Sequence, residues 1–502
     1  PAIISVNLAH GARKMAEIKV VVKRLTAIEN FGQMDVLCTD KTGTITLGKM
    51  GFDAAVCQDG HESKKVAFYG YLNAHFQSGY KSPIDDALVE KKFDVTGWEK
   101  TAEIPYDFIR KRLSVVFNHE GKKILITKGA FLQVLSLCNQ VELLDGTVVS
   151  ISQKKDQIER YFEEQAERGI KVIAVAYGTT DKEQDLVFLG FLSFSDPIKP
   201  GVEKVIRDLK EKGVTLKIIT GDHHLVAKNV AHAIGMNHTS VVTGVELYKI
   251  SDHALLKIVR EKNVFAEIEP NQKERLIFAM RKSGFIVGYL GDGVNDVSAL
   301  HAADVAIAVD GGADVAKAVS DIVLLEKDLD VLKEGVEEGR RTFANTLKYV
   351  YMATSSNFGN MFSMAGASLF LSFLPLLPKQ ILFSNFLCDL PEMALATDRV
   401  DADITAKPVR WDMSFIRRFM VVFGLLNAVA DFLTFGVLLF YLKADVALFR
   451  TGWFVENVAS AALIALVIRT KGSSFRSKPG RLLTFSVLIV AVGVFFIPLS
   501  PL

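Results

Sequence analysis

The sequence predicts an α/β fold with a mainly parallel sheet, an α+β domain inserted into it, and an α-helical transmembrane bundle after it. Short β-rich runs alternate with helical patterns over residues 30–340, which is typical of a parallel sheet. Between about residues 47 and 190 the pattern changes and includes a hairpin across Gly121, which indicates an inserted domain. After residue 341 long apolar stretches follow, which indicates helices that cross a membrane.

The composition supports a chain of mixed character. Its 502 residues are too many for one ordinary core, and 49% hydrophobic with 23% charged residues excludes disorder and fibrous repeats. The net charge of +2 gives no global bias toward nucleic acid, and the four cysteines, without CxxC spacing, suit a reducing cytosolic side. We expect four parts: 1–29, the end of a membrane helix and a cytoplasmic stalk; 30–46 with 191–340, the sheet domain; 47–190, the inserted domain; and 341–502, about five spans.

Four apolar runs predict the buried parallel strands of the sheet domain. They are Met34–Thr39, Thr215–Thr220, Phe285–Leu290 and Val305–Val309. Each run ends in a turn that carries Asp, Gly or Thr, and ligands gather at the carboxyl ends of such strands. We therefore look for the functional residues in these turns.

Stretches almost free of charge mark the expected spans. Residues 349–378 and 482–502 hold no Asp, Glu, Lys or Arg, and 419–442 and 451–468 hold one acid each. Residues 380–397 carry two acids and are interpreted as a further span. The loops after the second and fourth spans are basic, so they and everything before the spans are expected on the cytoplasmic side. Buried helices of a soluble protein are the alternative, but so many apolar stretches in succession disfavour it.

The first strand ends at a candidate nucleophile. Asp40 begins the string Asp-Lys-Thr-Gly-Thr-Ile-Thr directly after that strand. A carboxylate can attack a phosphoryl group if cations offset the charge repulsion. Lys41, Thr44 and the backbone of the Gly43 turn would cradle the phosphate.

Two other strand ends add to this chemistry. Thr220-Gly221-Asp222 offers a hydroxyl, a backbone N–H and a carboxylate. The string from Gly291 to Asp296 offers carboxylates for Mg²⁺, a hard ion that prefers oxygen ligands. Lys273 lies on a predicted helix between them, where it would bind phosphoryl oxygens as a point charge. Each motif alone could be a simple turn, but all of them, each after a strand, argue against that interpretation.

The strings DKTGTIT, TGD and GDGVND resemble those of the P-type ATPases, cation pumps that form an aspartyl-phosphate. Asp196-Pro197 and Lys128-Gly129-Ala130 also match family patterns, and the resemblance covers essentially the whole chain. It implies a haloacid-dehalogenase-like phosphorylation domain with an inserted nucleotide-binding domain, and ATP and Mg²⁺ as cofactors. The implied catalytic residues are Asp40, Lys41, Thr42, Thr44, Thr220, Gly221, Asp222, Lys273 and Asn295. The implied Mg²⁺ ligands are Asp40, Thr42, Asp292 and Asp296.

The second residue after the nucleophile separates a pump from a phosphatase. Related soluble phosphatases carry an Asp there as general acid and base, whereas this chain has Thr42. Without that base the acyl-phosphate survives long enough to be coupled to movement. A membrane-tethered phosphatase and a non-catalytic ATP-binding regulator are the alternatives; the intact Asp40, Lys273 and Asp292 argue against the second.

The inserted domain is expected to bind ATP. An aromatic residue beside a basic run suits an adenine face and phosphates, and such a run precedes the hairpin. The resemblance implies stacking of adenine on Tyr106 and a pocket lined by Lys128. The nucleotide set is Tyr106, Lys111, Arg112, Lys128 and Gly129; a solvated basic face is the alternative for each residue taken singly.

Polar residues within the first two spans indicate the site of the transported ion. Asn357 and Asn360 lie within one helical turn, and Asn385, Asp389 and Glu392 recur on one helical face, near the helix-interrupting Pro391. Buried carboxylates in lipid imply a function, and oxygen ligands argue for a hard cation rather than copper or zinc. A structural polar cluster is the alternative for this set, and that alternative is stronger for Asp431 or Glu456 taken alone.

Three strings are most similar to the bacterial magnesium-transporting subfamily: Arg24 to Thr44, which leads into Asp40, Ser355 to Asn360 in the first span, and Trp453-Phe454-Val455-Glu456. Ca²⁺ and H⁺ are the alternative ions. We expect a fragment that lacks the N-terminal spans and the actuator domain, from a multi-pass protein of the plasma or inner membrane with cytoplasmic catalytic domains. The expected partners are a divalent cation and membrane lipid, without nucleic acid or an obligate protein partner.

Overall fold

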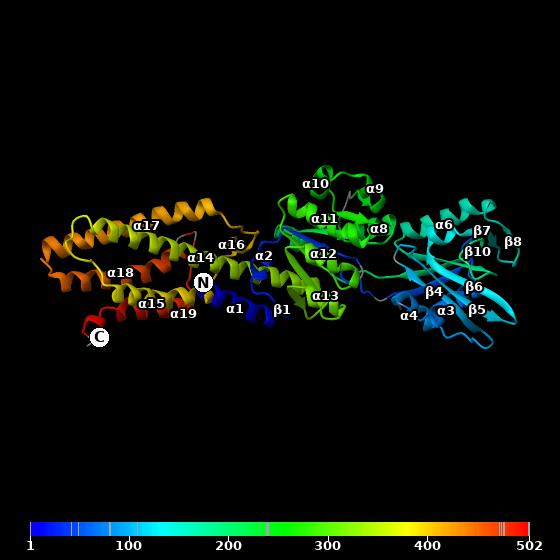
Figure 1. Ribbon diagram of the computed structural model, residues 1–502, viewed down its shortest axis with the longest axis horizontal. Helices are drawn as coiled ribbons and strands as arrows, with labels where there is room; N and C mark the ends of the chain where they lie inside the picture. Colours follow the sequence, from blue (N-terminus) through cyan, green and yellow to red (C-terminus); the bar gives the residue numbers. More distant parts are fainter. Residues whose placement is uncertain are drawn as a thin grey trace. The chain divides into compact units, whose positions relative to one another are not determined.

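The computed structural model describes residues 2–41, 43–48, 50–79, 82–107, 109–236, 240–470, 472, 474 and 477–499 (Figure 1). Its contacts divide the chain into two compact units. The first unit comprises Pro1–Leu37, Asp208–Thr215 and Gly284–Leu502, and the second comprises Cys38–Arg207 and Leu216–Ser283. The strand β2 (Val36–Thr39), which precedes Asp40, contributes residues to both units.

The sheet strands of the first unit are short and apolar. β14 (Val287–Leu290), β15 (Val305–Val309) and β16 (Ile322–Leu324) pair in parallel, and β1 (Val20–Val22) pairs antiparallel with β16. Every residue of β14, β15 and β16 is buried, as expected for parallel strands covered on both faces. The predicted strands near residues 285–290 and 305–309 are therefore confirmed.

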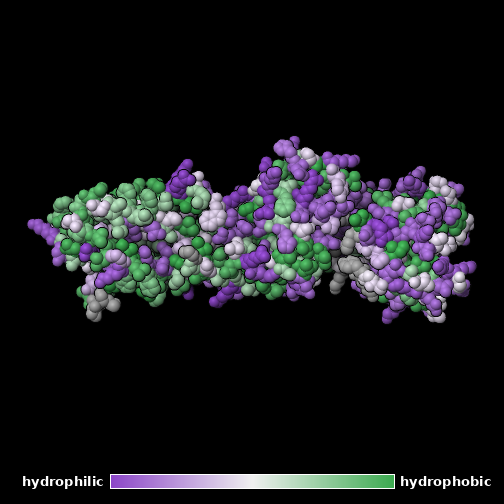
Figure 2. All heavy atoms as spheres, in the orientation of Figure 1, coloured by the Kyte–Doolittle hydropathy of each residue, from purple (hydrophilic) through white to green (hydrophobic). Residues whose placement is uncertain are grey.

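Long helices make up the rest of the first unit. They are α1 (Ala2–Glu17), α2 (Ala27–Gln33), α14 (Leu329–Ala367), α15 (Pro378–Ala394), α17 (Met413–Gly436), α18 (Val446–Ile468) and α19 (Arg481–Gly493). Helices thus occur in each of the five stretches predicted as spans. Among the described residues, two helical segments are long and apolar enough to cross a membrane, Met413–Tyr441 and Val446–Ile468. Hydrophobic residues dominate the surface over these C-terminal helices (Figure 2).

Glycines let α14 approach two other helices closely. A Cβ atom added at Gly32 of α2 would lie 2.6 Å from the backbone carbon of Gly339 in α14. A Cβ atom added at Gly359 of α14 would lie 2.9 Å from the backbone oxygen of Gly424 in α17. At both points the backbones meet without an intervening side chain.

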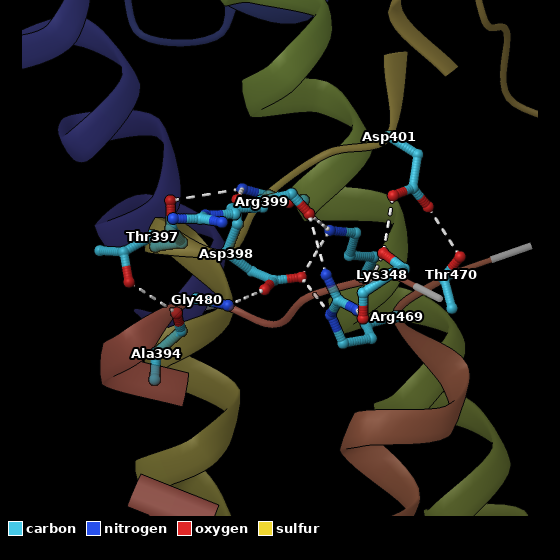
Figure 3. Close-up of polar contacts among 12 residues, drawn as sticks. Lys348, Ala394, Thr397, Asp398, Arg399, Asp401, Arg469, Thr470 and Gly480 are labelled. Atoms are coloured by element: carbon cyan, nitrogen blue, oxygen red, sulfur yellow. Dashed lines mark hydrogen bonds and ion pairs between the residues drawn. The ribbon is translucent and has the colours of Figure 1, made fainter. Parts of the chain in front are cut away.

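A buried ion-pair cluster joins α14 to the ends of other helices (Figure 3). The fully buried carboxylate of Asp398 accepts from Lys348 Nζ at 2.7 Å and from Arg469 Nε at 2.9 Å. It also accepts from the backbone N–H of Gly480 at 2.8 Å. Because one anion satisfies groups from three segments, the cluster fixes α14 against the end of α18 and the start of α19.

The second unit contains two kinds of sheet. β11 (Thr215–Ile219), β13 (Val264–Ala266) and β12 (Val241–Thr243) form parallel pairs, with α8 (His224–Ala233) and α11 (Pro270–Lys282) between them in the chain. The inserted part is antiparallel except for the pair β7·β10. Its path is β4 (Glu99–Asp107), β5 (Arg112–His119), β6 (Lys122–Ala130), β9 (Lys171–Gly178), β10 (Leu186–Ser195), β7 (Cys138–Glu142) and β8 (Val148–Ser150), and β3 (Gly51–Val56) pairs with β10.

Apolar side chains on both faces of this antiparallel sheet form cores. One core packs α3 (Lys64–Phe76) and α4 (Pro83–Val89) on the sheet, and the other packs α5 (Phe131–Leu135) and α6 (Lys155–Glu167). The predicted hairpin across Gly121 is the pair β5·β6. The structure thus confirms the predicted α/β fold class with an inserted α+β domain.

Candidate active site

Asp40 lies at the end of β2, where an ammonium group and a backbone N–H hold its carboxylate. Lys273 Nζ is 2.9 Å from Asp40 Oδ2, and the backbone N–H of Lys41 donates to Asp40 Oδ1 at 2.7 Å. Lys273 comes from the first turn of α11, which Pro270 begins at a position that suits proline. The side chain of Asp40 is 25% exposed whereas that of Lys273 is 5% exposed. Asp40 is therefore both accessible and next to a buried cation.

Asp222 joins two lysines beside this carboxylate. Lys41 Nζ is 2.6 Å from Asp222 Oδ2, and Lys171 Nζ is 3.0 Å from Asp222 Oδ1. Burial alone would raise the pKa of Asp222, but the ammonium groups of Lys171 and Lys41 outweigh it and hold the pKa well below its usual range. Asp222 in turn raises the pKa of Lys171. Asp222 and Lys171 are therefore both charged at neutral pH.

The loop after Asp40 is held by hydrogen bonds to Asp196. Thr46 Oγ1 donates to Asp196 Oδ2 at 2.6 Å, and the backbone N–H of Gly48 donates to Asp196 Oδ1 at 3.0 Å. Gly43 adopts a φ of 74°, a conformation that favours glycine. Thr44 is buried, and the predicted residue Thr42 lies outside the described residues.

Thr220 and Gly221 shape the loop that presents Asp222. Thr220 is buried, and its hydroxyl accepts from the backbone N–H of Asp222 at 3.2 Å. The exposed Gly221 links Thr220 to Asp222. The hydroxyl of Thr220 thus orients the loop.

The predicted Mg²⁺ ligands Asp292 and Asp296 and their neighbour Asn295 belong to the first unit. Asp292 Oδ2 is 2.5 Å from Lys327 Nζ, and Asn295 is exposed. Asp296 is buried, and its carboxylate accepts from Tyr289 Oη at 2.7 Å. Asp292 is the more accessible of the two carboxylates and Asp296 the more rigidly held.

In the inserted domain, Glu183 binds much of the predicted basic run. Its carboxylate accepts from Arg110, Arg112 and Ser114 at 2.8, 2.8 and 2.7 Å. Tyr106, at the end of β4, is 37% exposed, and Lys111 is partly exposed with a φ of 48°. Tyr106 and Lys111 are thus both in part exposed to solvent, whereas Arg112 is bound by Glu183.

Lys128 and Gly129 lie on β6 opposite the basic run. Gly129 pairs in register with Arg112, and an added Cβ atom at Gly129 would lie 2.5 Å from Arg112 Cβ. The buried Lys128 donates to Asp85 of α4. Burial raises the pKa of Asp85, but Lys128 outweighs burial and lowers it. The structure therefore brings Gly129 and Arg112 together, whereas the Lys128 side chain points to the other face of the sheet, toward Asp85.

The residues predicted to bind the transported ion have different environments. Glu392 is buried, whereas Asn357, Asn385 and Asp389 are exposed. Asn360 Oδ1 accepts from Asn457 Nδ2 of α18 at 2.6 Å.

A separate buried polar group surrounds Asp431 of α17. Its carboxylate accepts from Ser363 Oγ at 2.6 Å and from Trp453 Nε1 at 2.8 Å. Oε2 of Glu456, also in α18, is buried without a hydrogen-bond partner among the described residues. Buried polar atoms thus come from three helices: Ser363 of α14, Asp431 of α17, and Trp453 and Glu456 of α18.

Several partners in these sites were not predicted. Lys171, Asp85, Glu183 and Asn457 each bind a predicted site residue or its neighbour, yet none lies in a recognised string. The sequence does hold one signal: Lys171 opens a strongly apolar strand, where a cation is unexpected.

The Asp40 carboxylate beside Lys273 and the inserted antiparallel domain can be compared with known protein families. A family model for the P-type ATPase cytoplasmic domain N matches residues 88–201, and one for the C-terminus of cation transporting ATPases matches residues 373–502. Both matches are to models of the P-type cation-transporting ATPases, the class of protein to which this chain is similar.

Individual relatives are found among magnesium and calcium transporters. The chain is 40% identical over its full length to Magnesium-transporting ATPase, P-type 1 of Escherichia coli K12, and covers 58% of that protein. A relative of the same name from Salmonella typhimurium shows the same identity and coverage. The Calcium-transporting ATPase of Bacillus subtilis is 29% identical, with 64% of its length covered. The chain thus spans somewhat over half the length of these relatives.

Proposed function

We propose that this chain carries out ATP-driven transport of a cation, Mg²⁺, across a membrane through an aspartyl-phosphate on Asp40. The observation that carries the proposal is the accessible Asp40 carboxylate beside the buried Lys273 and close in sequence to Lys41, which Asp222 holds. The names of the magnesium-transporting relatives support the choice of ion.

The side chains around Asp40 suit a phosphoryl transfer. One Asp40 oxygen forms a bond to the γ-phosphorus while the bond from that phosphorus to the β–γ bridging oxygen breaks, and ADP leaves with the electron pair. Lys273 reduces the repulsion between the carboxylate and the incoming phosphate. Lys171 and Lys41 add positive charge on the same side, and Asp222 fixes their positions.

The oxygen donors of the chain fit a magnesium cofactor. Asp40, the Thr42 carbonyl and Asp292 would hold it, because Mg²⁺ prefers carboxylate and carbonyl oxygens. Asp296 would support the site indirectly, since its carboxylate already binds Tyr289. The ion supplies neutralising charge for the phosphate oxygens when it is bound.

The inserted domain would bind ATP through Tyr106, Lys111 and Lys128. The exposed ring of Tyr106 suits stacking on adenine, and Lys111 is accessible for phosphate contact. Arg112 and Gly129 would shape the pocket, because Arg112 is bound by Glu183 and Gly129 leaves room beside it.

The cargo would pass the polar residues of α14 and α15. Asn357, Asn360, Asn385, Asp389 and Glu392 would supply its oxygen ligands. We place the helices in the plasma or inner membrane, in contact with lipid, with both α/β parts in the cytoplasm and without an obligate protein partner. The predicted absence of nucleic-acid binding rests on the balanced charge of the chain.

Phosphate labelling tests the nucleophile. Incubation with γ-labelled ATP should label Asp40, and hydroxylamine should remove a label that acid leaves intact. Asp40→Asn should abolish labelling, while Asp145→Asn, in an exposed turn, should leave it unchanged. Labelling that persists in Asp40→Asn would refute the assignment.

Turnover across a panel of cations tests the cargo. Mg²⁺ should continue to stimulate the ATPase activity of reconstituted protein at concentrations above those that already saturate ATP. Asp389→Asn should remove this stimulation, because a divalent ion in a low-dielectric environment needs nearby negative charge. Stimulation by Ca²⁺ or by a proton gradient alone would replace Mg²⁺ as the cargo.

A further inference from the structure

Two histidines and a glutamate meet directly after Asp222, outside the residues used above for phosphoryl transfer. His223 and His224 lie at the start of α8, and Glu267 follows β13. His224 Nδ1 is 2.9 Å from Glu267 Oε1, and His223 Nε2 is 3.7 Å from the same oxygen. One donor atom from each residue lies within 4.8 Å of the other two, and no other such group occurs among the described residues.

We propose that His223, His224 and Glu267 bind a transition-metal dication of the zinc class. Two imidazoles and one carboxylate are a donor set of Zn²⁺ sites that keep an open position. Bonds of 2.0–2.2 Å in a tetrahedron place ligand atoms roughly 3.3 Å apart, and the two measured separations lie on either side of that value. The imidazoles also distinguish this site from a magnesium site, because Mg²⁺ prefers oxygen ligands.

The backbone prepares these side chains for a metal. Glu267 has a φ of 58°, and its N–H donates to the carbonyl of Asp222 at 2.9 Å. The carboxylate of Glu267 accepts from the backbone N–H of His224 at 3.2 Å, which holds it against the histidines. The contact from Leu225 N to His223 Nδ1 is long, at 3.4 Å, so little is lost if that nitrogen becomes protonated when Nε2 binds the metal.

A bound ion would restrain the loop that presents Asp222. The ion would join the start of α8 to the end of β13. The start of α8 follows Asp222 directly in the chain, and Glu267, after β13, donates its backbone N–H to the Asp222 carbonyl. The His223 ring also packs edge-on against Phe162 of α6, with ring centroids 5.0 Å apart. Because Asp222 holds Lys41 and Lys171, the ion should slow labelling of Asp40; this consequence, unlike the binding site itself, rests on the proposed function.

Cobalt spectroscopy on the full chain tests the site without relying on activity. Metal-free protein is titrated with Co²⁺ in excess Mg²⁺, which keeps oxygen-rich sites filled, and the visible d–d bands of tetrahedral cobalt are recorded. The unmodified chain should bind one Co²⁺ that Zn²⁺ displaces. His224→Gln and Glu267→Gln should each weaken Co²⁺ binding by at least about 100-fold, because loss of a direct ligand should cost more than loss of a residue that only supports a ligand, which costs up to about 100-fold. His232→Gln, an exposed histidine on the same helix, is the matched control and should bind normally.

Each of the following results would overturn a different part of the argument. Equal Co²⁺ affinity in the unmodified chain and both variants, or no tetrahedral spectrum in the unmodified chain, would refute the site. Loss of binding in His232→Gln as large as in His224→Gln would place the metal elsewhere. Tight Zn²⁺ binding that leaves Asp40 labelling unchanged would refute the restraint on Asp222, and absence of labelling even in metal-free protein would refute the proposed function alone.

Discussion

The buried pair of Lys128 and Asp85 makes it possible to separate a nucleotide-binding role of Lys128 from a structural one. Lys128→Met leaves the Asp85 carboxylate buried without its cation, which costs about 3–5 kcal/mol. The double variant Asp85→Asn/Lys128→Met removes both charges and should recover most of this loss. The asparagine oxygen still accepts from Ser82, so the α4 cap, worth about 1 kcal/mol, is largely kept.

ATP binding in the double variant then reports the role of Lys128 itself. Loss of a hydrogen bond to a charged phosphate costs about 1.5–3 kcal/mol, or roughly 10- to 150-fold in Kd. Calorimetry with ATP measures the Kd, thermal unfolding measures the stability, and Lys123→Met, an exposed lysine on the same strand, is the control. An unchanged Kd in the double variant would show that Lys128 only fixes α4. A single variant as stable as the double variant would refute the energetic argument.

Three further predictions follow from the same geometry. The pKa of Asp222 is depressed in the folded protein, so its ion pairs stabilise the fold fully above the unfolded pKa of about 3.9, and this stabilisation is lost as the pH falls through the lower folded pKa. Asp40 labelling should therefore show no transition from Asp222 between about pH 5 and 8. Lys41→Met removes one of the cations and should move the acidic transition of labelling to higher pH. Burial raises the pKa of the Cys38 thiol to about 12, so mass spectrometry after maleimide treatment at neutral pH should find Cys38 unmodified in native protein and modified after unfolding. Gly129→Ala should lower the free energy of unfolding by about 1–3 kcal/mol through contact with Arg112, and Gly311→Ala, with open space around it, should change it far less when both are compared by thermal unfolding.

The strands were predictable because their signal is local. Runs such as Val305–Val309 are apolar and β-branched, and the structure buries every residue of that strand. The positions of Asp40 and Asp222 at strand ends follow from the same local reasoning. The three-residue strands β1, β8, β12, β13 and β16 were not predicted, since so short a run carries little periodicity. The longer strands β3, β4, β7, β9 and β10 of the inserted domain were not predicted either.

The partners of the site residues were not predictable, because they depend on folding between distant segments. Lys128 lies 43 positions from Asp85, and Lys171 lies 51 positions from Asp222. The expected face of α15 shows the same limit: Asn385, Asp389 and Glu392 share a side of the helix, yet only Glu392 is buried. Spacing determines which residues point the same way, but burial depends on which other segments cover them.

The close glycine contacts of α14 determine how this helix can move. At 39 residues it is about 58 Å long, a stiff rod that continues from β16 into the group of apolar helices. Where Gly359 meets Gly424, a shift of one helical turn in either direction would bring Ser355 or Ser363 onto the facing backbone of α17. Where Gly32 meets Gly339, a shift in one direction would bring Phe343 onto the backbone of α2, whereas Gly335 lies one turn away in the other direction. Sliding of α14 along its axis is therefore blocked at its contact with α17, so α17 must tilt or rotate together with α14.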